Sequence, residues 1–527
     1  MFWILVGLAL ITLYWALSRH HSHWKRKGVV QGNPLFLLGN SWPMLLRKYS
    51  PPEMTEIFYK ASPNTRYFGL YDFLTPSLLL RDPNLIKQIT VKDFDHFVDR
   101  RPFVSEKADP LFGKSLFSLK GAKWREMRSS LSPAFTSSKM KYMFSLMSQT
   151  AEEFINHFLN QKEQVITVEM KEITTKFAND IIANIVFGYE CNSLKDPNNE
   201  FYVMGADLTN FRSLRFMLVF VGNVIAPKLL GWLKIPLFPR KVSNFFTRVV
   251  NENIESREKH GIVRPDMINL LLKLKNNNLK HDDVGTVPDT GFASVEESEI
   301  SKNEKLGLRK ITNEDIAAQA LLFFFAGYDS VSTLISYMAY ELAVNPNVQT
   351  KLLEEIDETM EKCDGKITYE ALMNMKYMDM VVSEALRKWP NAIATERICT
   401  KPYIIEPKLP NEKPLRLEIN DVVVIPMYAI QRDPQYYSEP ERFIPDRFSD
   451  ENKAKMNPYT FMSFGTGPRS CIGSRFALLE TKLLFYYFLT NFEFTPIEKT
   501  QIPIKFNRKS LNMSPEKGFW LGLKRRA

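Results

Sequence analysis

Residues 1–18 form an unbroken apolar stretch without a single charged side chain. As a helix they would extend about 27 Å, which is just enough to cross the hydrocarbon core of a bilayer. The stretch lacks the basic leader and the small-residue cleavage site of a cleaved signal peptide. We therefore interpret it as a transmembrane signal anchor that crosses the membrane once.

The polar flank of this stretch predicts the orientation of the chain. Four basic residues lie within residues 19–27, and the positive-inside rule keeps such a flank in the cytosol. Residues 19–50 are then a basic juxtamembrane linker, and residues 51–527 form the globular part on the cytosolic side.

The globular part is expected to be mainly α-helical with small β-sheets, an α+β fold. Residues 65–81 alternate in polarity and are rich in β-favouring side chains, which predicts a hairpin in a small sheet. From about residue 83 onwards helical periodicity dominates. Residues 274–311 are polar with few large apolar groups, which predicts a surface loop rather than a domain boundary.

A second apolar segment, residues 214–237, has two interpretations. Asn223, Pro227 and Lys228 interrupt it, so a second membrane span is not expected. It is either a core helix or a helix and loop that dip into the bilayer beside the anchor.

Residues 313–345 predict a long buried helix that carries polar groups. Acidic residues occupy its first turn and Asn345-Pro346 ends it, while its middle is apolar on every side. Gly327 there costs about 1 kcal/mol relative to alanine. Asp329 and Ser330 place an acid and a hydroxyl in the same apolar setting, where a carboxylate needs a reason.

Composition narrows the function classes. The 69 Lys and Arg exceed the 59 Asp and Glu, a net charge of +10. This charge suits a solvated basic surface, an anionic membrane or an acidic protein partner. The basic residues are dispersed without a zinc-finger or RNA-binding signature, which argues against nucleic acid. None of the seven His follows His281, which excludes a His-ligated metal or a Ser-His-Asp triad in the C-terminal half.

One motif predicts the chemistry. Residues 464–473 read FGTGPRSCIG and fit F-x-x-G-x-x-x-C-x-G. Gly467 and Gly473 predict a tight loop whose backbone can approach a flat ligand. The loop leads into an apolar helix, so Cys471 lies at a helix N-terminus, which favours a thiolate. A thiolate at the edge of an apolar loop suits a haem iron, and Arg469 is placed to meet a haem propionate.

On this motif the chain resembles the cytochrome P450 family of haem-thiolate monooxygenases, and the resemblance covers nearly the whole chain. It implies the P450 fold, with residues 51–527 as one haem-thiolate monooxygenase domain. Cys471 would be the axial iron ligand, and Phe464 would begin the haem-binding loop.

The resemblance also gives roles to the long helix. Ala326, Gly327, Asp329 and Ser330 resemble the A-G-x-D-T groove, which holds dioxygen while the acid and the alcohol relay protons. Ser330 replaces the usual Thr, retaining the hydroxyl but losing the methyl group and its rotamer restriction. We expect turnover to survive and leave the efficiency of electron coupling open.

Further motifs resemble the family's haem contacts. Trp124 and Arg128 fit W-x-x-x-R, which places both on one helix face as propionate partners. Arg397 stands where the family has another propionate arginine. Arg100 is a weaker candidate, whose alternative is an exposed salt bridge.

Three charged residues resemble the family's structural network. Glu384 and Arg387 fit the E-x-x-R helix and would form a buried ion pair on one helix face. Arg442, in the P-E-R-F segment, resembles the third member of a Glu–Arg–Arg network, and a buried charge needs such partners. Gln431 departs slightly from the family, which often has His there.

Candidate substrate-pocket positions follow the family's recognition segments. Their rings suggest an aromatic-lined cavity for a bulky lipophile, although phenylalanines on a buried helix more often belong to the core. The candidates are Phe103, Leu111, Phe112, Phe323, Phe324, Phe325, Ile393, Ala394, Thr395 and the segment from Lys505 to Leu511.

The resemblance implies an endoplasmic reticulum (microsomal) enzyme that inserts one atom of O2 into a lipophilic substrate and reduces the other to water. The chain has no dinucleotide or flavin fingerprint, so electrons from NADPH would come through a partner reductase, with cytochrome b5 as a second candidate donor. Lys123, Arg125, Lys139 and Lys141 are candidate docking residues; a solvated basic face is the alternative.

Two further segments of the sequence bear on the range of substrates. Residues 131–140 and 291–298 resemble insect microsomal members of the xenobiotic-metabolising branch, which favours oxidation of plant toxins and insecticides. The alternatives are a monooxygenase dedicated to an endogenous lipid or hormone and a haem protein that binds ligands without oxygenating them.

Overall fold

The computed structural model describes residues 2–526 except Phe103, Ser105, Arg212, Pro265 and residues 277–310. The pocket candidate Phe103 and the segment 291–298 therefore lie outside the described residues. The same is true of nearly all of the polar segment that predicted a surface loop.

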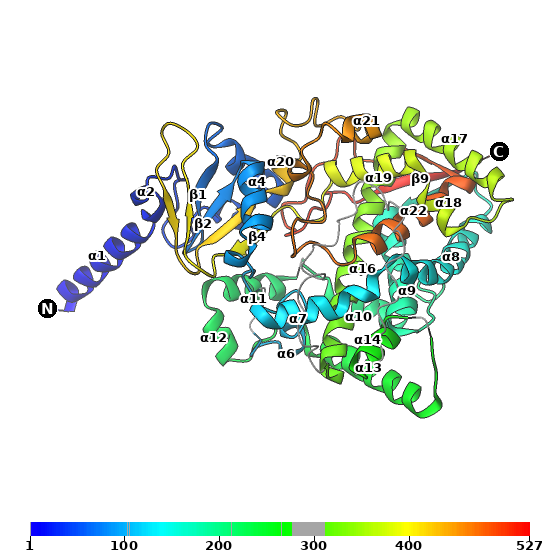
Figure 1. The fold of residues 1–527 in the computed structure, drawn as a ribbon, viewed down its shortest axis with the longest axis horizontal. Coiled ribbons are helices and arrows are strands. Elements are labelled where there is room, and N and C mark those ends of the chain that lie inside the picture. The colour runs from blue at the N-terminus through cyan, green and yellow to red at the C-terminus, as the bar shows by residue number, and fades with distance from the viewer. Residues whose placement is uncertain are drawn as a thin grey trace.

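The chain folds mainly into helices, which Figure 1 shows packed around the long helix α16. The helices are α1 (Phe2–His20), α2 (His23–Arg26), α3 (Trp42–Leu45), α4 (Pro51–Lys60), α5 (Pro83–Lys87), α6 (Pro110–Gly113), α7 (Gly121–Leu131), α8 (Ser137–Leu159), α9 (Met170–Phe187), α10 (Glu200–Leu208), α11 (Leu214–Ile225), α12 (Pro227–Trp232), α13 (Arg240–His260), α14 (Met267–Lys275), α16 (Asn313–Val344), α17 (Pro346–Lys362), α18 (Tyr369–Met373), α19 (Lys376–Lys388), α20 (Met427–Ile430), α21 (Asp450–Lys453) and α22 (Ser474–Asn491).

Small sheets complete the fold, which is the mainly α, α+β class expected. The strands are β1 (Tyr67–Asp72), β2 (Thr75–Leu80), β3 (Val165–Glu169), β4 (Thr395–Ile398), β5 (Tyr403–Ile405), β6 (Leu415–Leu417), β7 (Val422–Ile425), β8 (Phe492–Thr495) and β9 (Trp520–Arg525). They form a four-stranded sheet in the order β1-β2-β7-β4, a three-stranded sheet in the order β3-β9-β8 and the pair β5-β6.

The predicted hairpin is confirmed and forms one edge of the four-stranded sheet. β1 and β2 pair antiparallel with Tyr67 opposite Leu80, and β2 continues into a parallel pairing with β7. β4 pairs antiparallel with β7, which places Arg397 opposite Val423. The sheet has its own hydrophobic cluster, separate from the larger one among the helices.

The buried helix predicted over residues 313–345 is α16. Thr312 caps its N-terminus, because the Thr312 hydroxyl accepts from the Asp315 N–H while the Asp315 carboxylate accepts from the Thr312 N–H. Among the described residues α16 is the one helix long and apolar enough to cross a membrane, but 67% of its apolar stretch is buried in the protein. It is therefore a core helix.

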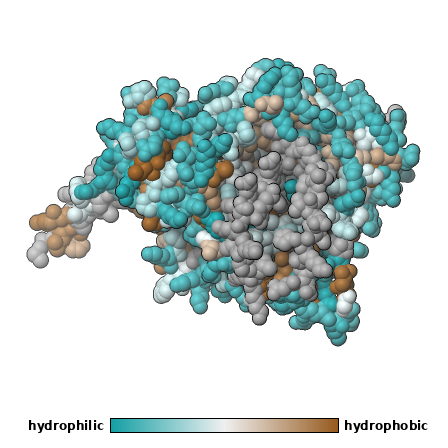
Figure 2. All heavy atoms as spheres, viewed as in Figure 1, coloured by the Kyte–Doolittle hydropathy of each residue, from teal (hydrophilic) through white to brown (hydrophobic). Residues whose placement is uncertain are grey.

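The N-terminal helix α1 projects away from the rest of the molecule in Figure 1. Its described side chains include Trp3, which is 80% exposed, and Trp15, which is 60% exposed. Figure 2 shows brown, hydrophobic atoms on this projecting helix beside a mainly teal body. Water-exposed apolar groups of this size need a cover outside the fold.

The second apolar segment is not a core helix. It forms α11 and α12, separated at Pro227, which begins the second helix. Phe216 and Val219 are buried, but Leu218 and Trp232 are 62% and 77% exposed. One face of the segment thus packs on the protein while an apolar face remains uncovered.

Candidate active site

The loop before Cys471 is bent by glycines. Gly465 and Gly467 have φ angles of 78° and 68°, in the left-handed region that favours glycine. A Cβ atom on Gly467 would overlap the carbonyl oxygen of Thr90. The Cys471 N–H donates to the Phe464 carbonyl over 2.8 Å, which closes the loop just before α22.

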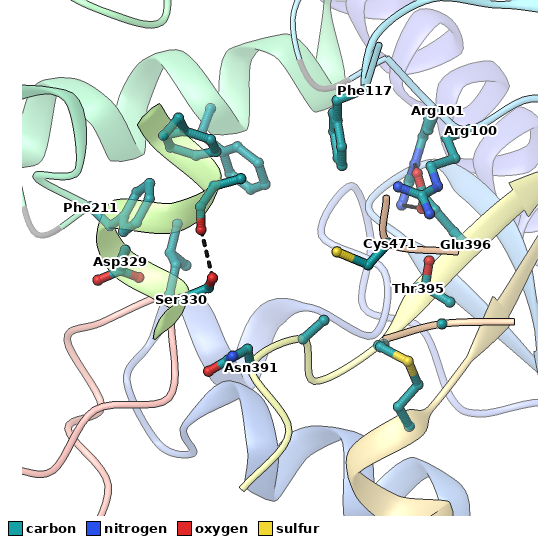
Figure 3. Close-up of a pocket in the computed structure, with 18 of the residues that line it drawn as sticks. Arg100, Arg101, Phe117, Phe211, Asp329, Ser330, Asn391, Thr395, Glu396 and Cys471 are labelled. Atoms are coloured by element: carbon teal, nitrogen blue, oxygen red, sulfur yellow. Dashed lines mark hydrogen bonds and ion pairs between the residues drawn. The ribbon is translucent and has the colours of Figure 1, made fainter. Parts of the chain in front are cut away.

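Cys471 faces a cavity of about 1100 Å³. Figure 3 shows Cys471 beside Arg100 and Glu396 on one side of this space and Ser330 across from it. Phe464 and Arg128 also line the cavity. The predicted loop and the predicted polar helix therefore meet at one site, although about 140 residues separate them in the sequence.

The surroundings of the Cys471 thiol act on its pKa in two opposite directions. Burial raises the pKa of the thiol above its ordinary value, although the Gly473 N–H, Arg128 and Arg100 lower it. Desolvation disfavours the charged form more than these groups favour it. The Gly473 N–H at the start of α22 lowers the pKa as the sequence predicts, but it offsets only part of the effect of burial.

Arginine side chains gather next to this loop. Arg469 is 4% exposed, donates to the carbonyls of Val98 and Leu119, and lies with its guanidinium 4.0 Å from the centre of the Trp124 ring. Arg100 donates to the Arg469 carbonyl over 2.7 Å. Arg128, from α7, donates to the Ser470 carbonyl over 3.1 Å.

The arginines in this cluster repel one another. Burial, followed by Arg100 and Arg397, lowers the pKa of Arg469 to about 8. Burial lowers the pKa of Arg100 to about 10, and burial with the neighbouring Arg100 lowers that of Arg397. Asp99 lies 3.6 Å from Arg469, and the Glu396 carboxylate acts on Arg100 and Arg397, so the cations of the cluster outnumber the carboxylates near them. Such a cluster requires an anionic partner.

The wall opposite Cys471 is the middle of α16. A Cβ atom on Gly327 would overlap Ile182 of α9, so glycine permits these helices to pack closely. The Ser330 hydroxyl donates to the Ala326 carbonyl over 2.6 Å, the bond dashed in Figure 3. Ala326, Gly327, Asp329 and Ser330 all line the cavity.

Asp329 has a partner that the sequence did not indicate. Lys171 of α9 donates to the Asp329 carboxylate over 2.8 Å, to its backbone carbonyl over 2.9 Å, and to Ser332 and Thr333 over 2.7 Å each. In Figure 3 the Asp329 carboxylate points away from Cys471. The acid is therefore held in place by a cation rather than left as an isolated charge.

Known proteins resemble this chain over its full length. A family model described as Cytochrome P450 matches residues 32–521. Cytochrome P450 9e2 of Blattella germanica is 43% identical, over 99% of this chain and 97% of that protein. Probable cytochrome P450 9f2 of Drosophila melanogaster is 39% identical, over 100% of this chain and 99% of that protein.

The chain belongs to the cytochrome P450 family. It is therefore a monooxygenase, and its family implies a haem-thiolate cofactor, a redox-partner reductase and a small-molecule substrate.

The residues around the cavity fit the haem of a cytochrome P450. The Nε atoms of Arg100 and Arg397 are buried without a hydrogen-bond partner among the described residues, and these cations lie close to one another. Two carboxylates on one planar ligand would supply the missing anions. Arg100 donates to the Arg469 carbonyl and forms no ion pair among the described side chains, so the exposed salt bridge that was its alternative is not observed.

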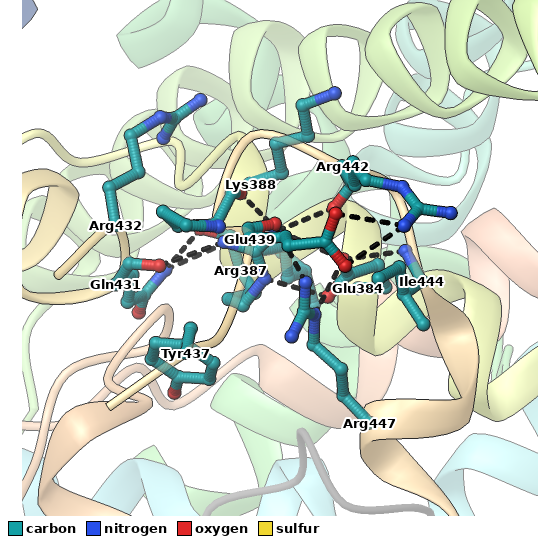
Figure 4. Close-up of polar contacts among 12 residues, drawn as sticks. Glu384, Arg387, Lys388, Gln431, Arg432, Tyr437, Glu439, Arg442, Ile444 and Arg447 are labelled. Atoms are coloured by element: carbon teal, nitrogen blue, oxygen red, sulfur yellow. Dashed lines mark hydrogen bonds and ion pairs between the residues drawn. The ribbon is translucent and has the colours of Figure 1, made fainter. Parts of the chain in front are cut away.

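The Glu–Arg pair of the family is present, but its third member is not Arg442. Glu384 and Arg387 of α19 are fully buried and 2.7 Å apart. Figure 4 shows the Arg442 side chain paired with Glu439, at 2.9 Å on the surface. Arg447 instead reaches Glu384, over 3.4 Å. The chain turns between these two arginines and brings the second one inward.

Gln431, which stands where the family often has His, connects the Glu–Arg helix to the segment before the Cys loop. It is fully buried and donates to the carbonyls of Leu386 and Arg387 over 3.1 and 2.8 Å. The side-chain amide oxygen of Gln431 accepts from the Met462 N–H over 2.9 Å and from the Ser463 hydroxyl over 3.1 Å.

The structure divides the predicted pocket residues. Phe325, Ala394 and Leu511 line the cavity, whereas Phe112, Phe324 and Ile393 do not. Phe112 and Phe324 are fully buried, and their rings contact Phe238 and Phe246, with centres 4.9 and 4.7 Å apart. These two are core residues.

Several lining residues were missed by the sequence reasoning. Phe117, Phe211 and Phe220 belong to this group. Phe220 lies in the apolar segment 214–237, whereas the other two had no distinguishing signal in the sequence. Phe323, a predicted pocket residue, does line the cavity.

Proposed function

We propose that Cys471 is the axial ligand of the haem and that this monooxygenase oxidises lipophilic compounds, foreign ones such as plant toxins and insecticides among them. When bound, the haem supplies the activation of dioxygen and the transfer of one oxygen atom to the substrate. The observation that carries the proposal is the Cys471 thiol in the cavity opposite Ser330.

The chain's own residues have separate tasks in this proposal. Arg100, Arg128 and Arg397, with Arg469 and Trp124 behind them, hold the propionate side of the haem. Ser330 holds a proton on its Oγ at the cavity wall, and Asp329 exchanges protons with the protein exterior. The apolar rings around the cavity exclude water from the site.

The function is tested by incubating the purified protein with NADPH, a cytochrome reductase and a panel of lipophilic compounds. We expect a product that carries one added oxygen atom from 18O2 for at least one compound. Ligand-induced changes in the haem spectrum without any oxidised product would favour a binding protein instead. A single active endogenous lipid in a broad panel would favour the dedicated enzyme.

Lys171 should influence how efficiently electrons reach the product. In the variant Lys171→Met the Asp329 carboxylate loses the cation that fixes it. We expect the ratio of product formed to NADPH consumed to fall about tenfold, less than the 10²–10⁴ that a general acid or base itself contributes. The same substitution at Lys176, which pairs with Glu172 on the same helix, should leave the ratio unchanged. An unchanged ratio in Lys171→Met would show that Asp329 acts without this cation.

A basic surface on α7 and α8 is proposed to receive the reductase, with cytochrome b5 as a second donor. Trp124 and Arg128 of α7 lie toward the cavity while Lys123 is exposed, so the surface is close to the haem site. Arg125 pairs with Asp95, and Lys141 pairs with Glu370. Lys123 and Lys139 are the residues to change, because one lies on α7 and the other on α8.

Reversing these charges should weaken the interaction with an acidic reductase. We expect Lys123→Glu combined with Lys139→Glu to raise the reductase concentration for half-maximal turnover about three- to tenfold, with a smaller difference at high salt. Lys259→Glu combined with Lys273→Glu, on α13 and α14, is the matched control. Equal behaviour of the two double variants would remove α7 and α8 from the docking surface.

We also propose that α1 is a single-pass anchor in the endoplasmic reticulum membrane, that residues 19–50 are its cytosolic linker, and that α11 and α12 dip into the same bilayer. The exposed Trp3 on α1 and the exposed Leu218 and Trp232 on α11 and α12 support this arrangement. Membrane fractionation of a chain without residues 2–20 tests it, and complete loss of membrane binding would argue against a contact by α11 and α12.

A further inference from the structure

Two adjacent cations of the C-terminal segment line the substrate cavity. Arg508 and Lys509 are exposed and belong to the cavity wall together with Ser510 and Leu511. The Asn507 side chain accepts from the Lys509 N–H over 2.9 Å, and the Asn507 N–H donates to the Ser514 carbonyl over 2.8 Å. The turn that carries both cations is thus held in a defined position.

The acids of the cavity are already paired with other cations. Arg101 binds Asp72 over 2.8 Å and Glu396 over 2.6 Å, and Lys171 binds Asp329 over 2.8 Å. Asp72, Glu396 and Asp329 are the carboxylate residues of the cavity wall. None of them remains to neutralise Arg508 or Lys509.

Within the described part of the chain, no ion pair or side-chain hydrogen bond joins Arg508 or Lys509 to a protein acceptor. Arg100, Arg128 and Arg469 also line the cavity but belong to the cluster that fits the haem propionates. The substrate side therefore carries positive charge that the described protein side chains do not balance, in a cavity whose wall also includes Phe117, Phe211 and other rings.

An apolar cavity with unbalanced cations suits a ligand with an apolar body and an anionic end. We propose that this enzyme prefers lipophilic carboxylates, whose carboxylate binds Arg508 and Lys509 while the hydrocarbon part lies against the aromatic wall. A guanidinium binds a carboxylate through two parallel hydrogen bonds, and the adjacent ammonium adds a third donor. The inference rests on the proposed function, because it specifies the substrate class of the same cavity.

Comparing two ligands of equal chain length separates the effect of the charge on binding from the effect of the hydrocarbon. Dodecanoate and 1-dodecanol are titrated into the purified full-length holoenzyme, and binding is measured by the haem spectrum and by equilibrium dialysis. We expect Arg508→Gln combined with Lys509→Gln to raise the Kd of dodecanoate about tenfold, because solvent screens the contacts of these exposed cations and keeps each of them weak. The Kd of 1-dodecanol should stay within about twofold, as for a ligand that makes no ionic contact.

The matched control is Lys505→Gln, which removes one positive charge from the same segment at an exposed residue outside the cavity wall. It should leave both ligands unaffected. Equal weakening of dodecanoate and 1-dodecanol, or no weakening of either, would overturn the proposal. So would a loss of dodecanoate binding in Arg47→Gln alone, because Arg47 is another exposed cation of the cavity wall. Dialysis needs no turnover, so inactivity toward every compound would count against the proposed function and not against this preference.

Discussion

Replacing Cys471 with alanine should abolish the thiolate signature of the haem in the reduced carbon monoxide difference spectrum. The cavity wall in the described structure offers no second thiol, since Cys191, Cys363 and Cys399 do not line it. Turnover should fall by more than about 100-fold, because even the outer partners of a metal ligand are worth 10–100-fold.

Cys363→Ala is the matched control, because it removes a half-buried thiol elsewhere in the chain. It should retain both the spectrum and the activity. A normal thiolate spectrum in Cys471→Ala would refute the assignment of the axial ligand. Haem content, measured separately, distinguishes a lost ligand from a lost cofactor.

The second large effect is expected at Arg387. Arg387→Leu leaves the Glu384 carboxylate fully buried, with Arg447 and the Ile444 N–H as its remaining partners among the described residues, at 3.4 and 2.9 Å. Removing one partner of a buried ion pair typically lowers the free energy of unfolding by about 3–5 kcal/mol. We expect a loss of this size in denaturant unfolding, together with reduced haem retention.

Arg442 provides the control for this prediction. Its side chain is 67% exposed and pairs with Glu439 at the surface, so Arg442→Gln should change the free energy of unfolding by less than about 0.5 kcal/mol. Arg447→Gln should give a value between the two. If Arg442→Gln were as destabilising as Arg387→Leu, the network would include Arg442 after all.

The misassignment of the third arginine shows what local sequence cannot specify. Pro440–Phe443 and Pro445–Phe448 are two similar segments, PERF and PDRF, five residues apart. Both segments contain an arginine, and the two arginines lie at similar distances from Glu384 along the chain. The path of the backbone between them decides which one reaches Glu384, and that path depends on packing against α19 rather than on either segment alone.

The run Phe323-Phe324-Phe325 shows the same limit for the cavity. Successive residues of an α-helix point about 100° apart, from 3.6 residues per turn, so three adjacent rings cannot share one direction. Because α16 is apolar on every side, its sequence carries no amphipathic phase that distinguishes the cavity side from the core side. The structure places Phe323 and Phe325 at the cavity and Phe324 in the core.

Features that depend on residues close to one another in the sequence were predicted well. The hairpin, the ends of α16, the Glu384–Arg387 pair and the tight turn before Cys471 all follow from spacing, capping and glycine conformation. Lys171 was not predicted, because 158 residues separate it from Asp329 and a single lysine near a helix start is unremarkable in sequence.

The glutamine at position 431 also determines how the contacts between the Glu–Arg helix and the segment before Cys471 respond to pH. An imidazole in the same place would titrate between pH 5 and 8, and its protonation would replace an acceptor with a donor facing the Met462 N–H. An amide has no such proton to gain. The connection between the Glu–Arg helix and the segment preceding Cys471 is therefore insensitive to acidity in this range, so that any pH dependence of catalysis has to originate elsewhere in the molecule.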